Sequence, residues 1–305
     1  MIKRKFSYTR DILPVFLLCA ALVSLVGLTG KEKLNITFDS AFRFSASLLG
    51  DQHSPSSKPV KSKKKENAFL RKFAWVDSAK KERETVFEIS ASALNDEIKK
   101  FGRPPSMTHP LLIQRRGFKI IGRRNFIRNR QVLEKVFTIV DYRQIFQRNM
   151  KYFPGLTRTL MTSAELSADD NPLRPFLYFV QHIPYRRPPD YYRGRFIGSF
   201  FVPLVCLYEQ YGDCDSKSLL LSEFLAAFPG STAKAAMVLV RGRGLSHAVL
   251  GVKGRPLPGM TALYFPRKGY YIVYETTSPG FSPGFVDRRV LDALKAGYFH
   301  FVELN

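Results

Sequence analysis

The sequence predicts an α+β fold in which a helix that carries a cysteine packs on an antiparallel sheet. Residues 214–228 place apolar side chains at helical spacing, and this run follows directly after the turn at Gly212 and Asp213. Segments 236–240, 246–252 and 270–276 then read as strands. An antiparallel arrangement of these strands would give the helix a face to pack against.

The composition supports a globular core in a strongly basic chain. Hydrophobic residues make up 45% of the 305 residues, which is enough for one large domain or two modest ones. Lys and Arg number 48 against 25 for Asp and Glu, which gives a formal charge of +23. We therefore expect attraction to polyanions or to anionic membrane surfaces.

Residues 1–30 are expected to anchor the chain in a membrane. The uncharged run from Ile12 to Gly30 follows several basic residues and approaches the roughly 20 residues that span a bilayer. Its length favours an uncleaved anchor over a cleaved signal peptide. The excess of basic residues before the run predicts that the N-terminus lies on the cytoplasmic side. The C-terminal part would then be extracytoplasmic, at the cell surface or in a periplasm.

Residues 31–67 form a linker rich in Ser, Lys and Pro, which ends near the lysine run 61–65. We interpret this linker as a solvated tether. Its lysines also suit contact with an anionic lipid or wall polymer, and that alternative stays open.

Residues 68–160 are expected to form a small α/β region that leads into the main domain. Strands are predicted at 73–76 and 85–89, and a helix at 92–101. A hairpin turning at Gly117 is predicted between strands 111–113 and 118–121, followed by a helix with an apolar stripe from Val132 to Val140.

The arginines between Arg115 and Arg130 form a dense basic patch. Few aromatic residues lie among them, and the region is expected to lie outside the cytoplasm. We therefore predict a solvated or polyanion-facing surface and no binding of nucleic acid.

Residues 161–305 hold the residues that we expect to carry chemistry. Cys214 lies where the helix begins, and the unpaired N–H groups and dipole of a helix start favour a thiolate, so a lowered thiol pKa is predicted. Strand periodicity places His247 and Glu275 on strand faces that an antiparallel pairing would bring side by side.

Together these three residues could carry out nucleophilic catalysis by a thiol. His247 would take the thiol proton of Cys214, and Glu275 would accept the other imidazole N–H and so fix the tautomer. The backbone N–H of Cys214 is a natural donor to an oxyanion, and the side chain of Gln181 is a second candidate donor.

Other chemistries find no support in the sequence. Cys19, Cys206 and Cys214 cannot form a disulfide framework, and no Cys/His cluster has zinc spacing. No Walker-type loop and no dinucleotide fingerprint is present, so neither a metal nor a cofactor is expected. For Cys206 we expect a buried packing role, with an oxidative link to Cys214 as the alternative.

Three motifs give the chain a family resemblance over about residues 176–284. Gly-Asp-Cys-Asp-Ser-Lys opens a helix, Ser-His-Ala-Val-Leu-Gly-Val places His247 33 residues after Cys214, and Glu-Thr-Thr places Glu275 28 residues after His247. This order resembles the transglutaminase-like cysteine proteinase superfamily, especially its bacterial and archaeal branch. Many members carry Asp at the third position, where this chain has Glu275.

The resemblance implies a papain-like core, with Cys214 as nucleophile, His247 as base and Glu275 as orienting acid. It implies a thiol enzyme that acts on a peptide or protein amide and passes the acyl group to water or to an amine. A hydrolase is favoured over a cross-linking enzyme. The alternatives are a non-catalytic domain that binds peptide or anionic cell-envelope components, and a protein whose main task is lipid or polyanion binding.

Overall fold

The computed structural model describes residues 64–305, except 66–67, 105–106, 108, 129–130 and 243. The described residues form one compact unit. The expected anchor at 1–30 and nearly all of the tether at 31–67 lie outside the described residues. Within the described part of the chain, no helix is both long enough and apolar enough to cross a membrane.

The elements of the first half alternate between hairpins and helices. They are β1 (Lys64–Lys65), β2 (Ala68–Val76), β3 (Glu82–Ser90), α3 (Ala91–Lys100), α4 (Pro110–Arg115), β4 (Phe118–Arg128), β5 (Gln131–Val140), α5 (Tyr142–Asn149), η1 (Met150–Tyr152) and α6 (Phe153–Ser163).

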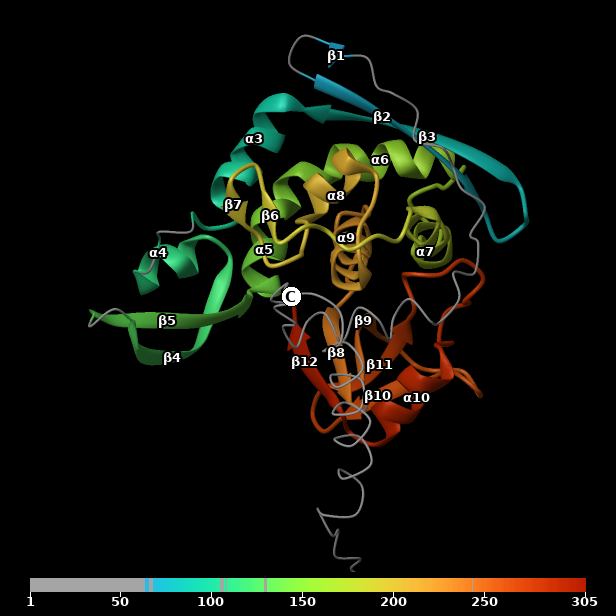
Figure 1. The fold of residues 1–305 in the computed structure, drawn as a ribbon. Helices are drawn as coiled ribbons and strands as arrows, with labels where there is room; N and C mark the ends of the chain where they lie inside the picture. Colours follow the sequence, from blue (N-terminus) through green and yellow to red (C-terminus); the bar gives the residue numbers. More distant parts are fainter. Residues whose placement is uncertain (1–63, 66–67, 105–106, 108, 129–130, 243) are drawn as a thin grey trace, which may run out of the picture. The chain divides into compact units, whose positions relative to one another are not determined.

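The second half holds the central helix and the main sheet (Figure 1). Its elements are α7 (Leu173–His182), β6 (Tyr191–Tyr192), β7 (Arg195–Phe196), α8 (Pro203–Glu209), α9 (Cys214–Ala226), β8 (Ala235–Gly242), β9 (Leu245–Lys253), β10 (Ala262–Phe265), β11 (Gly269–Tyr274), α10 (Arg288–Lys295) and β12 (Phe299–Glu303).

The main sheet has five strands in the order β10-β11-β9-β8-β12, and every neighbouring pair is antiparallel. Helix α9 packs on β9 and β8 from one side. Helix α10 covers the opposite face, where Val290 and Leu294 join a smaller cluster with Val238 and Val249 of the sheet. The predicted α+β class, with the cysteine helix on an antiparallel sheet, is confirmed at this level.

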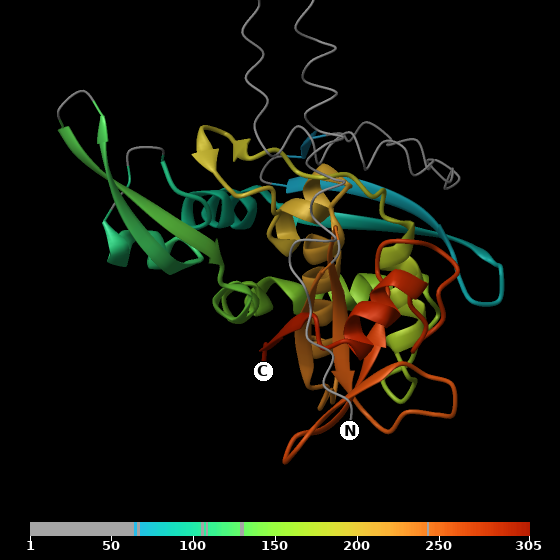
Figure 2. The ribbon, with the colours of Figure 1, turned by 60° about the horizontal axis from the view of Figure 1, so that its bottom comes forward.

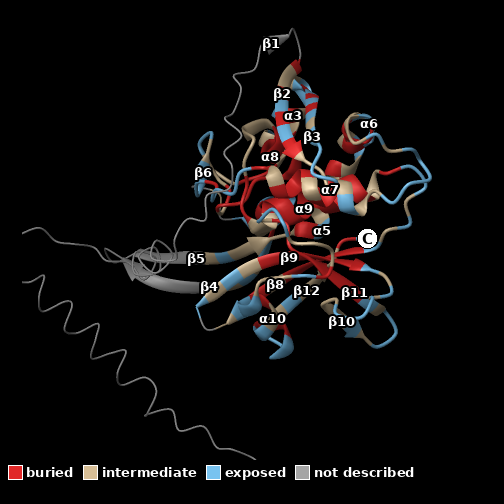
Figure 3. Cartoon of the chain, turned by 90° about the vertical axis from the view of Figure 1, so that its right-hand side faces the viewer, coloured by how far each residue is buried: buried red, intermediate tan, exposed pale blue. Residues whose placement is uncertain are grey.

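Helix α9 lies at the centre of the described fold and is buried on all sides. Every residue from Ser216 to Leu225 is buried, and the burial colouring shows the helix enclosed by α5, α7 and α8 (Figure 3). The sequence indicated a single apolar stripe. The structure instead encloses polar side chains as well, among them Lys217 and Glu223.

A cluster of aromatic rings joins the first half of the chain to the second. Phe87 of β3, Phe179 of α7 and Phe224 of α9 meet with ring centroids 5.6, 5.8 and 5.9 Å apart. Two of these contacts are edge-to-face and the Phe87–Phe224 contact is stacked, and aromatic pairs of both kinds stabilise a core beyond simple area burial. Residues on both sides of position 160 therefore share one core, and the boundary expected between 160 and 161 falls within α6.

Two of the predictions for residues 110–140 are wrong. Residues 111–113 lie in α4, which Pro110 begins, and do not form a strand. Residues 131–140 form β5, which pairs antiparallel with β4 from Phe118↔Val140 to Arg128↔Gln131. The hairpin carries α4 on β4 and extends away from the central helix α9 (Figure 2).

The physical reason for the second error is a double periodicity. Val132, Val136 and Val140 satisfy a helical spacing, yet they also lie on one face of a strand. The segment is rich in β-branched residues, which favour strands because their χ1 freedom is restricted in a helix.

Candidate active site

The turn before α9 is shaped by Gly212 and capped by Asp213. A Cβ on Gly212 would lie 2.8 Å from Sγ of Cys206 and 3.1 Å from Cβ of Ser216, so only glycine fits there without displacement. The Asp213 carboxylate accepts from the backbone N–H of Ser216 at 3.3 Å and from its hydroxyl at 2.5 Å. This N-cap makes Cys214 the first residue of the helix.

The start of α9 lies where β9 and β11 separate. Their pairing ends at Tyr274↔Leu250, so the backbone of Ala248 faces the helix instead of β11. The Ala248 N–H donates to the sulfur of Cys214, and the hydroxyl of Ser218 donates to the Ala248 carbonyl at 3.4 Å. Ser218 also shares a hydrogen bond of 2.9 Å with Thr276. Cys214 is thereby held beside the residue that follows His247.

His247 and Glu275 are joined directly. Nε2 of His247 lies 2.8 Å from Oε2 of Glu275. Oε1 of Glu275 accepts from the Thr277 N–H at 2.9 Å and from its hydroxyl at 2.5 Å. With Nε2 bonded to a carboxylate, the N–H of a neutral His247 lies on Nε2, and Nδ1 is left as the proton acceptor.

Glu275 is buried and charged. Burial would raise the pKa of its carboxyl, but the hydrogen bond and charge of His247, together with the two bonds from Thr277, lower the pKa below its ordinary value. A buried carboxylate of this kind is suited to orient an imidazole and to stabilise its charged form.

The thiol of Cys214 is not activated by its position alone. Burial raises its pKa well above the ordinary value, and the negative charges of Asp215 and Asp213 raise it further, against the lowering effect of the Ala248 N–H. The predicted lowering of the thiol pKa is therefore wrong. The helix start favours a thiolate, but burial and the carboxyl groups on either side of the cysteine outweigh it, so the resting side chain is a thiol.

Those two carboxyl groups form a coupled pair. Burial, followed by the charge of Asp215, raises the pKa of Asp213 well above its ordinary value. The hydroxyl of Tyr142 donates to Asp215 at 2.7 Å. Asp213 therefore keeps its proton to a higher pH than an ordinary aspartate does, which limits the negative charge beside Cys214.

Gln181 is buried close to the site but does not face an oxyanion. Its amide nitrogen donates to the carbonyls of Glu275 at 2.8 Å and of Phe281 at 2.9 Å, so both N–H bonds are occupied. This arrangement does not support the predicted oxyanion role. Gln181 instead fixes the backbone of the residue that orients His247.

Lys217 is a site residue that the sequence argument did not single out. Its side chain is fully buried, and Nζ donates to the carbonyls of Ile183 at 2.7 Å, Gln181 at 3.2 Å and Thr277 at 3.3 Å. Burial lowers the pKa of this ammonium to about 7, despite the opposing charges of Cys206, Glu275 and Cys214. The residue ties the end of α7 to the segment that follows Glu275.

A signal for Lys217 was present in the sequence. It precedes Leu220 and Leu221 by three and four positions, so it lies on the apolar stripe of the helix rather than on a polar face. A lysine in that position is expected to be buried, with its ammonium group bound to hydrogen-bond acceptors inside the protein.

Tyr185 forms an exposed aromatic edge beside the cysteine turn. Its neighbours pair with Gly212, since the Gly212 N–H donates to Pro184 at 3.2 Å and the Arg186 N–H donates to Gly212 at 3.0 Å. The Tyr185 pKa is raised, first by burial of the hydroxyl and then by the charges of Cys214 and Asp213.

Cys206 has the buried packing role that we expected. It is fully buried, and burial raises its pKa to about 12. Cys206 and Cys214 are both free thiols in the structure. In the described part of the chain, no three His, Cys, Asp or Glu side chains gather in a way that could hold a metal ion.

Comparison with known proteins gives no relative on which to base an assignment. The chain matches no protein-family model, no curated protein and no solved structure. We therefore infer the chemistry of the site from the geometry of its residues.

Proposed function

We propose that this chain is a membrane-anchored, extracytoplasmic thiol enzyme of the transglutaminase-like type, with a papain-like core. It cleaves or transfers the acyl group of a peptide or protein amide through Cys214, His247 and Glu275. One observation carries the proposal: Glu275 holds His247 at 2.8 Å, and the next backbone N–H along β9 donates to the Cys214 sulfur.

The reaction begins from a neutral thiol. His247 takes the thiol proton on Nδ1 as the sulfur attacks the amide carbonyl carbon, and Glu275 stabilises the imidazolium that forms. The C–N bond then breaks, the leaving amine takes the proton from His247, and an acyl-thioester remains on Cys214. Water or an amine gives a proton to His247 and attacks the thioester, and the released thiolate is reprotonated.

The start of α9 contributes to the electrostatics of this step. The N–H of Cys214, at the first position of the helix, has no intrahelical acceptor and is suited to donate to the oxyanion. A single preorganised donor of this kind contributes about 3 kcal/mol to transition-state stabilisation in enzymes.

One observation favours the alternative, a non-catalytic binding domain. The raised pKa of Cys214 means that the resting site contains no thiolate, and a domain without activity would need none. The two readings differ in whether His247 increases the reactivity of the thiol.

A transfer and hydrolysis assay on the full chain separates them. We expect incorporation of dansylcadaverine into casein, or release of free amine from casein, to be abolished in Cys214→Ala and His247→Ala. It should fall about 10²- to 10⁴-fold in Glu275→Gln, because the imidazole loses its orienting charge. Cys206→Ala is the matched control and should keep activity. Activity of Cys214→Ala equal to that of the natural sequence would refute the proposal.

A further inference from the structure

Three separate chain segments meet at the hairpin β6–β7. The Gly102 N–H donates to the carbonyl of Arg116 at 3.3 Å, which joins the end of α3 to the end of α4. Arg103 and Phe196 exchange two backbone hydrogen bonds of 3.0 and 2.8 Å, which joins the same segment to β7. A Cβ on Gly102 would lie 3.1 Å from Cβ of Arg195, so the segments approach closely.

Arginines from three elements lie at or beside this junction. Arg116 follows α4, Arg195 begins β7, and Arg148 of α5 binds Glu97 of α3. Burial, followed by the positive charges of Arg195 and Arg148, lowers the pKa of Arg116. We call Arg116, Arg148 and Arg195 the arginine cluster. Arg116 and Arg195 both lie beside Gly102, and Arg148 binds Glu97, which lines the same small pocket as Arg195.

The cluster contains more positive than negative charge. Glu97 is its one buried carboxylate among the described residues, and Arg148 binds this carboxylate through Nη2 at 2.9 Å and Nε at 3.1 Å. Asn149 also donates to Glu97 at 3.1 Å. In the described structure, neither Arg116 nor Arg195 forms an ion pair with a carboxylate.

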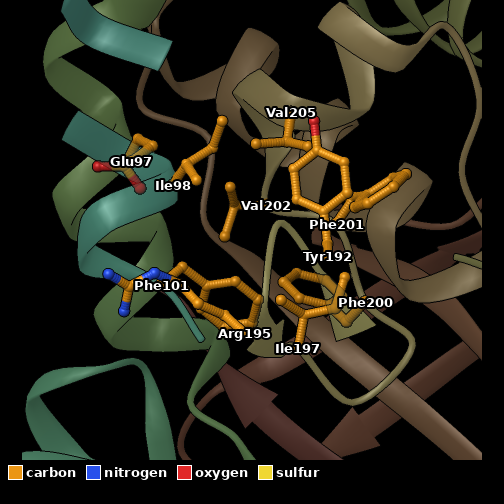
Figure 4. A pocket seen from close by; sticks show the side chains of 10 residues that line it. All are labelled: Glu97, Ile98, Phe101, Tyr192, Arg195, Ile197, Phe200, Phe201, Val202 and Val205. Atoms are coloured by element: carbon orange, nitrogen blue, oxygen red, sulfur yellow. The ribbon is translucent and has the colours of Figure 1, made fainter. Parts of the chain in front are cut away.

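Buried donors without an acceptor remain beside the cluster. Nη1 of Arg195 and Nε of the neighbouring Arg103 are buried and donate to no acceptor within the part of the chain that the structure describes. Figure 4 shows Arg195 at the margin of a small apolar pocket that Glu97 also lines. The pocket, with about 10 Å³ of free volume, holds at most one water molecule, so its interior does not supply the missing acceptors.

We propose that the arginine cluster is a binding site for a phosphate oxyanion. Three guanidinium groups and one carboxylate leave a net charge of about +2, which the charge of a phosphate dianion balances. The planar N–H fork of arginine matches the oxygen geometry of phosphate, and buried unpaired donors are costly until an acceptor reaches them. The basic patch of the sequence thus includes a defined anion site, separate from the amide chemistry of Cys214.

Occupancy of the site would also stabilise the segment that borders the cysteine turn. The segment 185–200 contains β7 and is fastened at both ends to that turn. Arg186 donates to Gly212 at one end, and the Phe201 N–H donates to the Ser216 hydroxyl at 3.0 Å at the other.

Thermal unfolding and calorimetric titration of the full chain with inorganic phosphate test the proposal. Sodium chloride of matched ionic strength serves as the reference salt. We expect millimolar phosphate to raise the unfolding temperature of the natural sequence and of Arg158→Gln, a matched variant of an exposed arginine on α6. Arg195→Gln and Arg116→Gln should bind phosphate at least about tenfold more weakly.

The unliganded variants provide a second readout. Because like charges repel in the empty cluster, Arg195→Gln and Arg116→Gln should unfold at the same temperature as the natural sequence or at a higher one when phosphate is absent. An equal phosphate response in all four proteins would mean general salt stabilisation and would overturn the proposal. So would the absence of any response in the natural sequence.

Two soluble probes distinguish the source of the phosphate. Glycerol phosphate carries a monoester dianion, and glycerophosphoglycerol carries the diester of a lipid headgroup. Binding of the monoester alone, lost in Arg195→Gln, assigns the site to a free phosphate or phosphate monoester. Equal binding of the diester, also lost in Arg195→Gln, assigns it to a lipid headgroup.

Discussion

At the scale of single residues, the proposed reaction depends on a base rather than on a preformed thiolate. Burial and two neighbouring carboxyl groups oppose ionisation of Cys214, and the Ala248 N–H favours the charged form without outweighing them. In the proposed reaction, His247, fixed by Glu275, therefore accepts the thiol proton as the sulfur attacks.

Removal of one carboxyl charge should make the thiol more reactive. We expect Asp215→Asn to lower the pKa of Cys214, since the charge of Asp215 is the largest contribution to the raised pKa after burial. Asparagine keeps an oxygen that can accept from Tyr142. Each pKa unit corresponds to about a tenfold change in thiolate population. The rate of iodoacetamide alkylation of Cys214, followed against pH by mass spectrometry, measures the shift.

The exposed Asp169 supplies the control for this experiment. Asp169→Asn should leave the alkylation profile unchanged. If Asp215→Asn alkylates no faster than Asp169→Asn at neutral pH, the assigned electrostatic cause is wrong.

The sequence pointed to the candidate reacting residues but not to the side chains that hold them in place. Motif spacing pointed to Cys214, His247 and Glu275, and the structure brings the imidazole and the carboxylate together. The second contact of Gln181, with Phe281 100 residues away, depends on tertiary packing that no local pattern records. The carbonyl ligands of Lys217 also come from two distant segments, so only its position on the apolar stripe could be read locally.

At the scale of elements, the turn before α9 depends on close packing at Gly212. A methyl group there would contact Cys206 and Ser216, and overpacking of this kind costs about 1–3 kcal/mol of stability. We expect Gly212→Ala to lower the free energy of unfolding by that amount and to shift the position of Cys214. Denaturant unfolding measures the first effect, and alkylation kinetics measure the second.

Two further variants serve as controls for Gly212→Ala. Gly155 lies within α6 with no atom within 4 Å of an added Cβ, so Gly155→Ala should stabilise the protein by roughly 0.5–1 kcal/mol. Cys206→Ala removes the sulfur that lies 2.8 Å from the added methyl, and it should recover part of the loss in the double variant. Strictly additive effects would contradict the proposed clash.

Elements with one clear periodicity were predictable. The hairpin β2–β3, helix α9 and strands β8 and β9 appear where the sequence placed them. The hairpin β4–β5 was missed because its apolar residues fit two periods, and α4 was missed because a short apolar run does not distinguish a helix from a strand. The strand register and the strand order could not be predicted from the sequence and were established by the structure.

At the scale of the whole molecule, the buried ammonium of Lys217 couples stability to pH. The folded protein releases this proton near pH 7, whereas the unfolded chain keeps it until about 10.4. Between these values the unfolded chain binds more protons, so the free energy of unfolding rises with pH.

A comparison of two chains isolates this contribution. Relative to Lys217→Met, the natural sequence should gain roughly 2 kcal/mol of stability between pH 7 and pH 9. Urea unfolding at both pH values measures the difference. Lys253→Met, which alters a lysine at the exposed end of β9, is the control and should show no such slope. A difference between Lys217→Met and the natural sequence that is constant over this range would contradict a buried, titrating Lys217.

The formal charge of +23 acts on a different property of the whole chain. It favours association with anionic surfaces and does not determine the reaction at Cys214. The arginine cluster is the place in the described structure where that charge is organised into a site with unpaired buried donors.

Trapping an acyl group on the protein tests directly whether Cys214 is the nucleophile and His247 its base. The full chain would be mixed with 4-nitrophenyl acetate, and nitrophenol release and intact mass would be followed together. We predict a burst of about one nitrophenol per chain, an acetyl group mapped to Cys214, and loss of the burst in His247→Ala with Cys206→Ala unaffected. Acetylation of Cys214 at the same rate in His247→Ala, or an acetyl group on another residue, would contradict the assignment of Cys214 and His247 as nucleophile and base.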